Sequence, residues 1–313
     1  MERRQLGASG VDVSRLMLGC GNFGGVGSAP EFFGQGESDD EALVIMDGAW
    51  ELGMTTFDTA DAYGGGRSEL AIGKWIASRG QRPEITTKTF NPRDAGADRG
   101  LSRARMTRQL ESSLDRLGVD HVDLYLAHDF DPDTPLAETV ETLEGLQQIG
   151  LIRAWGVSNF DAAQLRAVFE FGRPAVVQTS YSLLARSDEE EVIELCTQLG
   201  ISYTPFGPLA GGLLSGKYRS GEAPPAGSRL ATRPTPYEHL LSEELFTSLD
   251  RLAAAATDRG VRSTTLAIAW LLAQPAVSAV VIGPRRIEHL EPAVSALDVH
   301  LSEDEAAAIA ALF

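Results

Sequence analysis

The chain has 313 residues, of which 43% are hydrophobic, 27 are basic and 44 are acidic, giving a formal charge of −17 at neutral pH. This length suits one large domain or two ordinary ones, and the apolar fraction can build a substantial core. The acidic balance argues against a general nucleic-acid binder or a protein of anionic membranes, because both need a basic surface. We therefore expect no nucleic-acid partner and no membrane partner.

The N-terminus and the cysteines predict a cytoplasmic protein. MERRQLGASG lacks the apolar core of a signal peptide. LAIAWLLA, the most apolar late run, is too short to span a bilayer. Cys20 and Cys196 are too few for a disulfide framework and lack metal-ligand spacing, so a reducing compartment fits.

A β-hairpin opens the predicted order of elements, because RRQLG and VDVSRL flank a turn at Gly10. Short apolar strands then alternate with helical stretches. The predicted strands are 15–19, 55–58, 84–88, 122–127, 152–157, 175–180, 201–206 and 278–283. The predicted helices are 39–53, 67–78, 101–118, 135–150, 161–172 and 187–200, followed by a Pro- and Gly-rich insertion at about 219–237 and further helices up to the C-terminus.

The helix ends carry their own signals. Ser38 or Asp39 can cap the first helix. Glycines stand just past four predicted helix ends, where a left-handed residue closes a helix. They are Gly53, Gly118, Gly150 and Gly200.

Eight strand-then-helix units predict a single (β/α)₈ TIM barrel over residues 1–313, with an N-terminal β-hairpin and extra helices near the C-terminus. Several strands lack polar alternation, as expected when both faces are buried. A doubly wound sheet is the rival, and it would carry fewer strands and a Gly-rich turn that opens its first helix. No linker with a shift in composition divides the chain.

Two glycine-rich segments imitate nucleotide motifs. Residues 19–24, GCGNFG, match G-x-G-x-x-G, but GVGSAPEFFGQGE follows and cannot begin the helix that the dinucleotide fingerprint requires. Residues 211–218, GGLLSGKY, miss a P-loop because Tyr218 replaces the Ser or Thr that binds Mg²⁺. The second segment still offers backbone N–H groups and Lys217 to a phosphate after the seventh strand, where barrels often bind phosphate; the alternative is a surface turn.

Five polar side chains and one aromatic ring follow consecutive predicted strands. Active sites of such barrels lie at the C-terminal ends of the strands, and Tyr63 lies just beyond Asp58. The residues at these ends are Asp58, Lys88, His128, Asn159, Gln178 and Phe206. Each alone has a structural explanation, but six on consecutive strands predict a shared site.

A tyrosine, a lysine, a carboxylate and an imidazole suit carbonyl chemistry. The unperturbed pKa of tyrosine is about 10, and Lys88 is expected to lower the pKa of Tyr63. Asp58 can hold Lys88, and His128 can orient a substrate oxygen. Acyl hydrolysis is disfavoured because no Ser–His or Cys–His pair is evident, and no metal is expected, since neighbouring residues such as His128 and Asp129 diverge at a strand end.

These motifs together resemble the aldo-keto reductase superfamily, in a bacterial-type form related to the β-subunits of potassium channels. The resemblance runs nearly end to end. It is strongest in FDTADAYG with the following SE..IG and in GVSNF, and it extends through LGASGVDVSRLMLGCGNFG, TTKT, VDLYLAHDFDPDTP, VVQTSYSLL, TPFGPLAGGLLSGKY and VVIGPRRIEHLEP. It implies a barrel without a Rossmann domain that binds NADPH or NADP⁺ in extended form across the barrel mouth.

The resemblance also implies roles for individual residues. Tyr63 would be the general acid, Lys88 and Asp58 would tune its pKa, and His128 would bind the carbonyl. Phe206 would stack on the nicotinamide ring. The implied cofactor contacts are Gly19, Cys20, Asp58, Ser158, Asn159, Gln178, Phe206, Gly207, Pro208, Leu209, Ala210, Gly212, Lys217, Arg229, Gly283, Arg285 and His289.

Within this set, Ser158, Asn159 and Gln178 match the positions that hold the nicotinamide carboxamide. Leu209, Gly212 and Lys217 match the pyrophosphate segment, with Arg229 folding over it, and Gly283 and Arg285 match the segment at the 2′-phosphate of the adenosine. His289 and Ala293 depart from the family pattern, in which Gln or Arg and then Asn are common.

The resemblance implies NADPH-dependent reduction of an aldehyde, ketone or sugar carbonyl, which is a small-molecule substrate. Two alternatives remain open: a sugar or alcohol dehydrogenase that uses NADP⁺ in the reverse direction, and a cofactor-binding regulatory subunit of the channel β-subunit type. The substrate, the preferred direction, the strictness for NADPH and the oligomeric state are not readable from the sequence.

Overall fold

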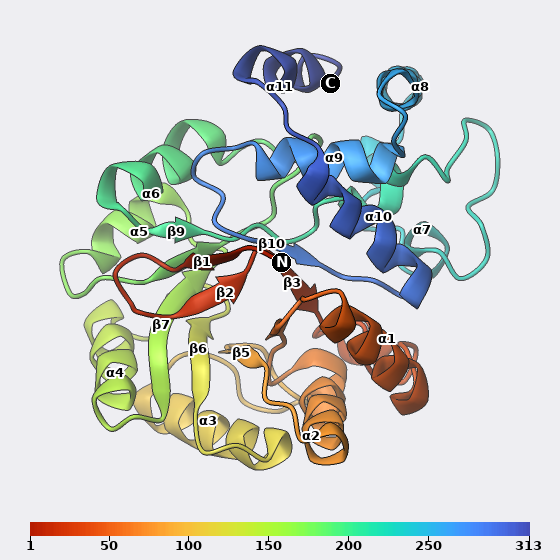
Figure 1. Ribbon diagram of the computed structural model, residues 1–313. Coiled ribbons are helices and arrows are strands. Elements are labelled where there is room, and N and C mark those ends of the chain that lie inside the picture. Colours follow the sequence, from red (N-terminus) through yellow and green to blue (C-terminus); the bar gives the residue numbers. More distant parts are fainter.

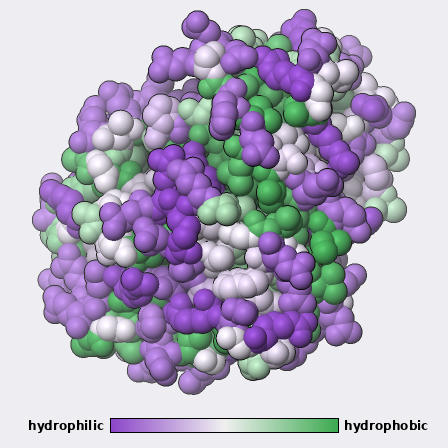
Figure 2. All heavy atoms as spheres, viewed as in Figure 1, coloured by the Kyte–Doolittle hydropathy of each residue, from purple (hydrophilic) through white to green (hydrophobic).

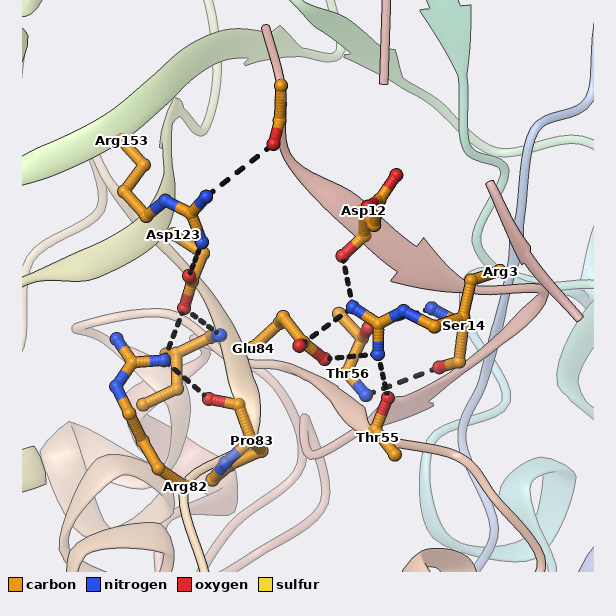
Figure 3. Close-up of polar contacts among 12 residues, drawn as sticks. Arg3, Asp12, Ser14, Thr55, Thr56, Arg82, Pro83, Glu84, Asp123 and Arg153 are labelled. Atoms are coloured by element: carbon orange, nitrogen blue, oxygen red, sulfur yellow. Dashed lines mark hydrogen bonds and ion pairs between the residues drawn. The ribbon is translucent and has the colours of Figure 1, made fainter. Parts of the chain in front are cut away.

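An antiparallel hairpin lies across the N-terminal end of the barrel in the computed structural model, which describes residues 1–313. It consists of β1 (Arg3–Gln5) and β2 (Asp12–Ser14), as predicted. Arg3 ties it to the barrel, because its guanidinium lies 2.8 Å from Glu84 and donates to Thr55 at 2.8 Å (Figure 3). Arg153 donates to the carbonyl of Gly10 at 3.5 Å on the other side of the hairpin.

Eight parallel strands form the barrel, in the order β10-β3-β4-β5-β6-β7-β8-β9 (Figure 1). Two backbone hydrogen bonds, from Ser278 N to Tyr203 O and from Val281 N to Pro205 O, both 2.9 Å, join the β10 segment to the β9 segment and close the barrel. The closed barrel confirms the predicted fold and excludes the doubly wound sheet. The strands are β3 (Leu16–Gly19), β4 (Thr56–Asp58), β5 (Glu84–Thr89), β6 (Val122–Ala127), β7 (Ile152–Ser158), β8 (Val176–Gln178), β9 (Ser202–Tyr203) and β10 (Val280–Ile282).

Helices surround these strands (Figure 1). The α-helices are α1 (Asp39–Glu51), α2 (Arg67–Arg79), α3 (Arg103–Leu117), α4 (Leu136–Gln148), α5 (Ala162–Val168), α6 (Glu194–Leu199), α7 (Arg229–Thr232), α8 (Glu243–Asp258), α9 (Ser263–Leu272), α10 (Leu290–Val294) and α11 (Glu303–Ala310). The short turns of helix are η1 (Pro30–Phe32), η2 (Tyr63–Gly66), η3 (Glu189–Ile193), η4 (Ala210–Ser215), η5 (Glu238–Leu240), η6 (Ile287–His289) and η7 (Ser295–Asp298). The helix predicted at 187–200 therefore begins with the π-helical turn η3, and α8 to α11 are the predicted extra helices.

Local chemistry explains where the helices begin and end. Ser38 caps α1 in a reciprocal capping box with Glu41, which decides between the two predicted caps. The four predicted closing glycines all have positive φ, between 66° and 83°. The insertion at 219–237 contains only α7, so most of it is a loop, as predicted.

Two apolar clusters fill the molecule. The smaller cluster, which includes Leu6, Val13 and Leu124, joins the hairpin to the inner face of the sheet and plugs one end of the barrel. The larger cluster packs the helices onto the outside of the strands, and every residue of β6 is buried, which accounts for its lack of polar alternation.

The outer surface is mostly hydrophilic on the hairpin side, with an apolar band that runs toward α1 (Figure 2). Val44 on α1 and Ile287 before α10 are among the exposed apolar side chains. None of the helices combines the length and the apolar character that a bilayer crossing requires.

Candidate active site

The four residues singled out in the sequence converge at the C-terminal ends of β4, β5 and β6. Asp58 ends β4, Lys88 lies near the end of β5, His128 follows β6, and Tyr63 begins η2. Lys88 Nζ lies 2.5 Å from Asp58 Oδ1 and 5.1 Å from the centroid of the Tyr63 ring. The hydroxyl of Tyr63 lies 3.5 Å from His128 Nε2. The parallel register brings these strand ends together, as the sequence predicted.

Lys88 is fixed by a buried hydrogen-bond network. Its ammonium donates to Asp58 and, at 2.9 Å, to the carbonyl of Thr59. Gln178 donates to the other oxygen of Asp58 at 2.9 Å. Burial disfavours the charged ammonium, but attraction by Asp58 and Tyr63 outweighs it, so the pKa of Lys88 lies above its usual value. Lys88 is therefore a permanent cation beside Tyr63 at neutral pH.

Tyr63 is partly buried beside the cavity, and loss of hydration at its hydroxyl decides the direction of its pKa shift. Burial raises the pKa of its hydroxyl, Lys88 lowers it, and Asp58 raises it again, so that the pKa lies above its usual value. The contribution of Lys88 has the predicted sign, but loss of hydration outweighs the ammonium, so the net pKa lies above its usual value. Tyr63 consequently stays protonated and able to donate at neutral pH.

His128 is a neutral imidazole. Burial, reinforced by the charge of Lys88, lowers its pKa to about 3. The amide nitrogen of Asn91 lies 3.5 Å from Nδ1, and because an amide N–H can only donate, this contact favours the proton on Nε2. Asn159 donates to the backbone carbonyl of His128 at 2.8 Å and fixes this segment. Tyr63 O–H and His128 Nε2–H are thus two neighbouring donors.

The neutral state of His128 has a consequence for stability. Its pKa is lowered in the folded protein, so the unfolded chain binds a proton first as the pH falls below about 6.5. We expect His128 to reduce the free energy of unfolding by about 2 kcal/mol between pH 7 and pH 5. Urea unfolding of the wild type and of His128→Gln at both pH values measures the difference. The exposed His300 supplies a matched control in His300→Gln, and equal pH slopes for wild type and His128→Gln would contradict a buried neutral imidazole.

A cavity of about 910 Å³ opens beside Tyr63 and Asp58 and extends over β10, η4, α8 and the start of α9. The predicted cofactor residues that line it are Gly19, Asp58, Phe206, Gly207, Pro208, Leu209, Gly212, Lys217, Arg229, Gly283, Arg285 and His289. Ala293 lines it as well. The volume suits an extended dinucleotide rather than a single small substrate.

Five predicted cofactor residues lie outside this lining: Cys20, Ser158, Asn159, Gln178 and Ala210. Cys20 is fully buried, and its Sγ lies 3.5 Å from the carbonyl of Leu18, so its side chain faces the interior. Burial raises the pKa of the Cys20 thiol well above its usual value. Gln178 keeps its carbonyl oxygen free while its nitrogen donates to Asp58.

The η4 segment has the shape of an anion cradle. Gly211 and Gly212 have φ of 67° and 92°, a region that favours glycine. A Cβ added at Gly212 would lie 2.5 Å from Lys217 Nζ, so the absence of a side chain lets the ammonium approach the backbone. With Arg229 and Arg285 also lining the cavity, the donors fit a phosphate-bearing cofactor.

Sequence reasoning missed the partners of these cations. Arg229 donates to Asn22 Oδ1 at 2.6 Å, and Arg285 Nε donates to Glu37 Oε1 at 2.7 Å. Asn22 lies inside the segment that imitates a dinucleotide motif, which is a loop in the structure and is followed only by the short turn η1 before α1. The pairing of Glu37 with Arg285 could not be predicted from the sequence, because no local pattern relates two residues that are 248 positions apart.

The acidic residues after β6 accept hydrogen bonds from backbone N–H groups and do not form a cluster with His128. Asp129 accepts from Phe130 N at 2.8 Å, and Asp131 accepts from Leu101 N at 2.7 Å. No three His, Cys, Asp or Glu side chains are arranged to hold a metal ion. The two carboxylates order the loop beside the site.

The chain matches the family model described as Aldo/keto reductase family over residues 15–313. It is 37% identical to the protein named "Uncharacterized oxidoreductase YrpG" of Bacillus subtilis, with 97% of this chain and 93% of the relative covered. It is 32% identical to the "Probable voltage-gated potassium channel subunit beta" of Oryza sativa, with 96% and 92% covered.

Among solved structures, a glycerol dehydrogenase from Gluconobacter oxydans superposes with a TM-score of 0.85 at 26% identity, with 99% of this chain and 94% of the other covered. The family supports an oxidoreductase that acts on carbonyl or alcohol groups. The barrel, the clustered Asp58, Tyr63, Lys88 and His128, and the family model that matches from residue 15 to the C-terminus agree: this chain belongs to the aldo/keto reductase family.

Proposed function

We propose that this protein reduces an aldehyde, ketone or sugar carbonyl to the alcohol with NADPH, and that Tyr63 supplies the proton. The observation that carries the proposal is the pair of donors, Tyr63 O–H and His128 Nε2, 3.5 Å apart beside the cavity. This separation is long for a direct hydrogen bond, and it lets one carbonyl oxygen accept from both groups.

The chemistry follows from where charge develops. NADPH, when bound, supplies a hydride to the carbonyl carbon, and the oxygen gains negative charge. His128 donates a hydrogen bond to that oxygen, and Tyr63 transfers its proton to it. Lys88 lies 5.1 Å from the centre of the tyrosine ring, so its charge stabilises the tyrosinate that remains. Asp58 and Gln178 hold Lys88 in place.

The cavity lining supports the assignment of the cofactor. Phe206 presents a ring on which a nicotinamide can stack, and such offset stacking contributes about 0.5–1.5 kcal/mol. Gln178, Ser158 and Asn159 lie outside this lining, at the ends of β7 and β8, and would add amide and hydroxyl groups for the nicotinamide end. The η4 cradle with Lys217 would hold the pyrophosphate, and Arg229 would fold over it. Gly283, Arg285 and His289 would hold the adenosine end.

We further propose that residues 1–313 form one domain and that the protein acts in the cytoplasm. The family model starts at residue 15, but the ion pair of Arg3 with Glu84 fastens the hairpin to the barrel. The acidic charge and the two free, buried cysteines suit a reducing compartment without anionic partners.

Two relatives favour other functions. The likeness to a glycerol dehydrogenase favours the reverse reaction, oxidation of an alcohol or sugar with NADP⁺. The likeness to a channel subunit favours a regulatory role with a bound cofactor. A panel of aldehydes, ketones and sugars, followed by NADPH absorbance, with matched alcohols and NADP⁺ at neutral and alkaline pH, separates the three. Oxidation of NADPH by carbonyls supports reduction, faster NADP⁺ reduction supports the dehydrogenase, and no turnover together with co-purification of a membrane protein supports the regulatory subunit.

Arg285 is the residue on which we place preference for NADPH. We expect Arg285→Ala to raise the dissociation constant of NADPH about tenfold to hundredfold and that of NADH about twofold or less, because only NADPH carries the 2′-phosphate. Titration of protein fluorescence with each dinucleotide measures both constants. An equal loss of affinity for both dinucleotides would show that Arg285 does not bind the 2′-phosphate.

A further inference from the structure

Arg285 does not face the cavity as a free cation. Its Nε donates to Glu37 Oε1 at 2.7 Å, and its NH1 donates to the carbonyl of Gly227 at 2.5 Å. A bidentate grip on a phosphate uses two adjacent N–H groups of the guanidinium. Two of the three guanidinium nitrogens therefore already hold oxygens of the protein.

Glu37 is a buried and incompletely satisfied carboxylate. Its side chain is 4% exposed, and its second oxygen, Oε2, has no hydrogen-bond partner. Its backbone is held on both sides, since Glu37 N donates to Asn22 O and Gly24 N donates to Glu37 O, each at 2.9 Å. The carboxylate is thus fixed under the wall of the cavity that Arg285 forms.

Besides Arg285, Glu37 interacts with a second cation of this cavity wall, Arg229. Arg229, Arg233 and Arg285 all line the cavity. Burial lowers the pKa of Arg229 most, and the charges of Arg285 and Arg233 lower it further. Burial raises the pKa of Glu37 more than its ion pair with Arg285 lowers it. The negative charge of Glu37 therefore offsets part of the repulsion among these arginines.

We propose that Glu37 is a specificity-determining residue that weakens the preference for NADPH over NADH by neutralising and restraining Arg285. The inference rests on the proposed function, because it assumes a nicotinamide dinucleotide in this cavity. A 2′-phosphate must approach a buried carboxylate and compete with it for the guanidinium. A ribose 2′-hydroxyl meets neither penalty, so Glu37 reduces the gain in affinity that Arg285 gives to NADPH and leaves NADH binding unaffected.

The test uses Glu37→Gln, which removes the charge while its amide oxygen can still accept from Arg285 Nε. We expect the ratio of the dissociation constants of NADH and NADPH to rise about tenfold, mainly through tighter NADPH binding, as for a charge removed a few ångströms from a phosphate. Titration of intrinsic fluorescence with each dinucleotide, without substrate, gives both constants. Glu31→Gln removes an exposed charge from the same loop and should leave the ratio unchanged.

A double-mutant cycle separates this role from a general effect on the loop. In an Arg285→Ala background, Glu37→Gln should raise the ratio clearly less than in the wild type, because only the direct repulsion between the carboxylate and the 2′-phosphate is then left to remove. An unchanged or smaller ratio in Glu37→Gln, or the same increase without Arg285, would overturn the inference while both dinucleotides still bind. If neither dinucleotide binds the wild-type protein, the proposed function fails and the inference fails with it.

Discussion

Tyr63→Phe should lower the turnover number about 10²–10⁴-fold, the range for loss of a positioned general acid. The dissociation constant of NADPH should change little, because the hydroxyl lies beside His128, which is not among the expected cofactor contacts. The raised pKa of Tyr63 makes its protonated form dominant at neutral pH, so its hydroxyl holds the proton that is to be transferred. Steady-state rates and fluorescence titration of NADPH measure the two effects separately.

Tyr125→Phe is the matched control. Tyr125 is a fully buried tyrosine of the barrel, and its hydroxyl donates to the carbonyl of Met106 at 3.1 Å, outside the cavity lining. This variant should keep its turnover number within about threefold of wild type, since it loses only one neutral hydrogen bond. Turnover by Tyr63→Phe at the level of Tyr125→Phe would show that Tyr63 is not the donor.

Lys88→Met should have the largest effect on stability. The side chain of Lys88 is 1% exposed and that of Asp58 is 4% exposed, so the variant leaves an uncompensated buried carboxylate. We expect the free energy of unfolding to fall by about 3–5 kcal/mol. Turnover should fall about a hundredfold or more, because the tyrosinate loses its neighbouring cation. Urea unfolding and steady-state rates check both.

A second variant separates folding from catalysis. Lys88→Met combined with Asp58→Asn removes both charges, and it should recover part of the lost stability without recovering turnover. The exposed ion pair of Lys74 with Asp39 provides the control, and Lys74→Met should cost less than about 1 kcal/mol. A double variant that regained turnover would show that Lys88 serves only to neutralise Asp58.

The fold was predictable because its signals are local. Alternating apolar strands and capped helices occur along the chain in the order in which the barrel is built, and Ser38, Gly118 and Gly200 mark helix ends by their own conformational preferences. The convergence of Asp58, Lys88 and His128 was predictable for the same reason. Each lies at the end of a strand, and parallel strands bring their ends to one edge.

The partners of the cavity arginines and the pKa of Tyr63 depend on contacts between distant segments. No pattern in the sequence relates Glu37 to Arg285 or Asn22 to Arg229, because these pairs join loops whose shapes follow from packing. The net direction of the Tyr63 pKa shift was not predictable, because it depends on how far the hydroxyl is withdrawn from water, which the sequence does not give. The departures at His289 and Ala293 pointed to an altered adenosine site, but the ion pair beneath it appears only in three dimensions.

Transfer of deuterium tests the central claim most directly. NADPH that carries deuterium at C4 of the nicotinamide, prepared with the label on either face, is given to the protein with an aldehyde or ketone of the panel, and the alcohol is analysed by mass spectrometry. We expect one deuterium on the carbinol carbon from one of the two labelled cofactors, while the hydroxyl proton exchanges with water. An alcohol without deuterium from either cofactor would contradict hydride transfer to a carbonyl placed beside Tyr63 and His128.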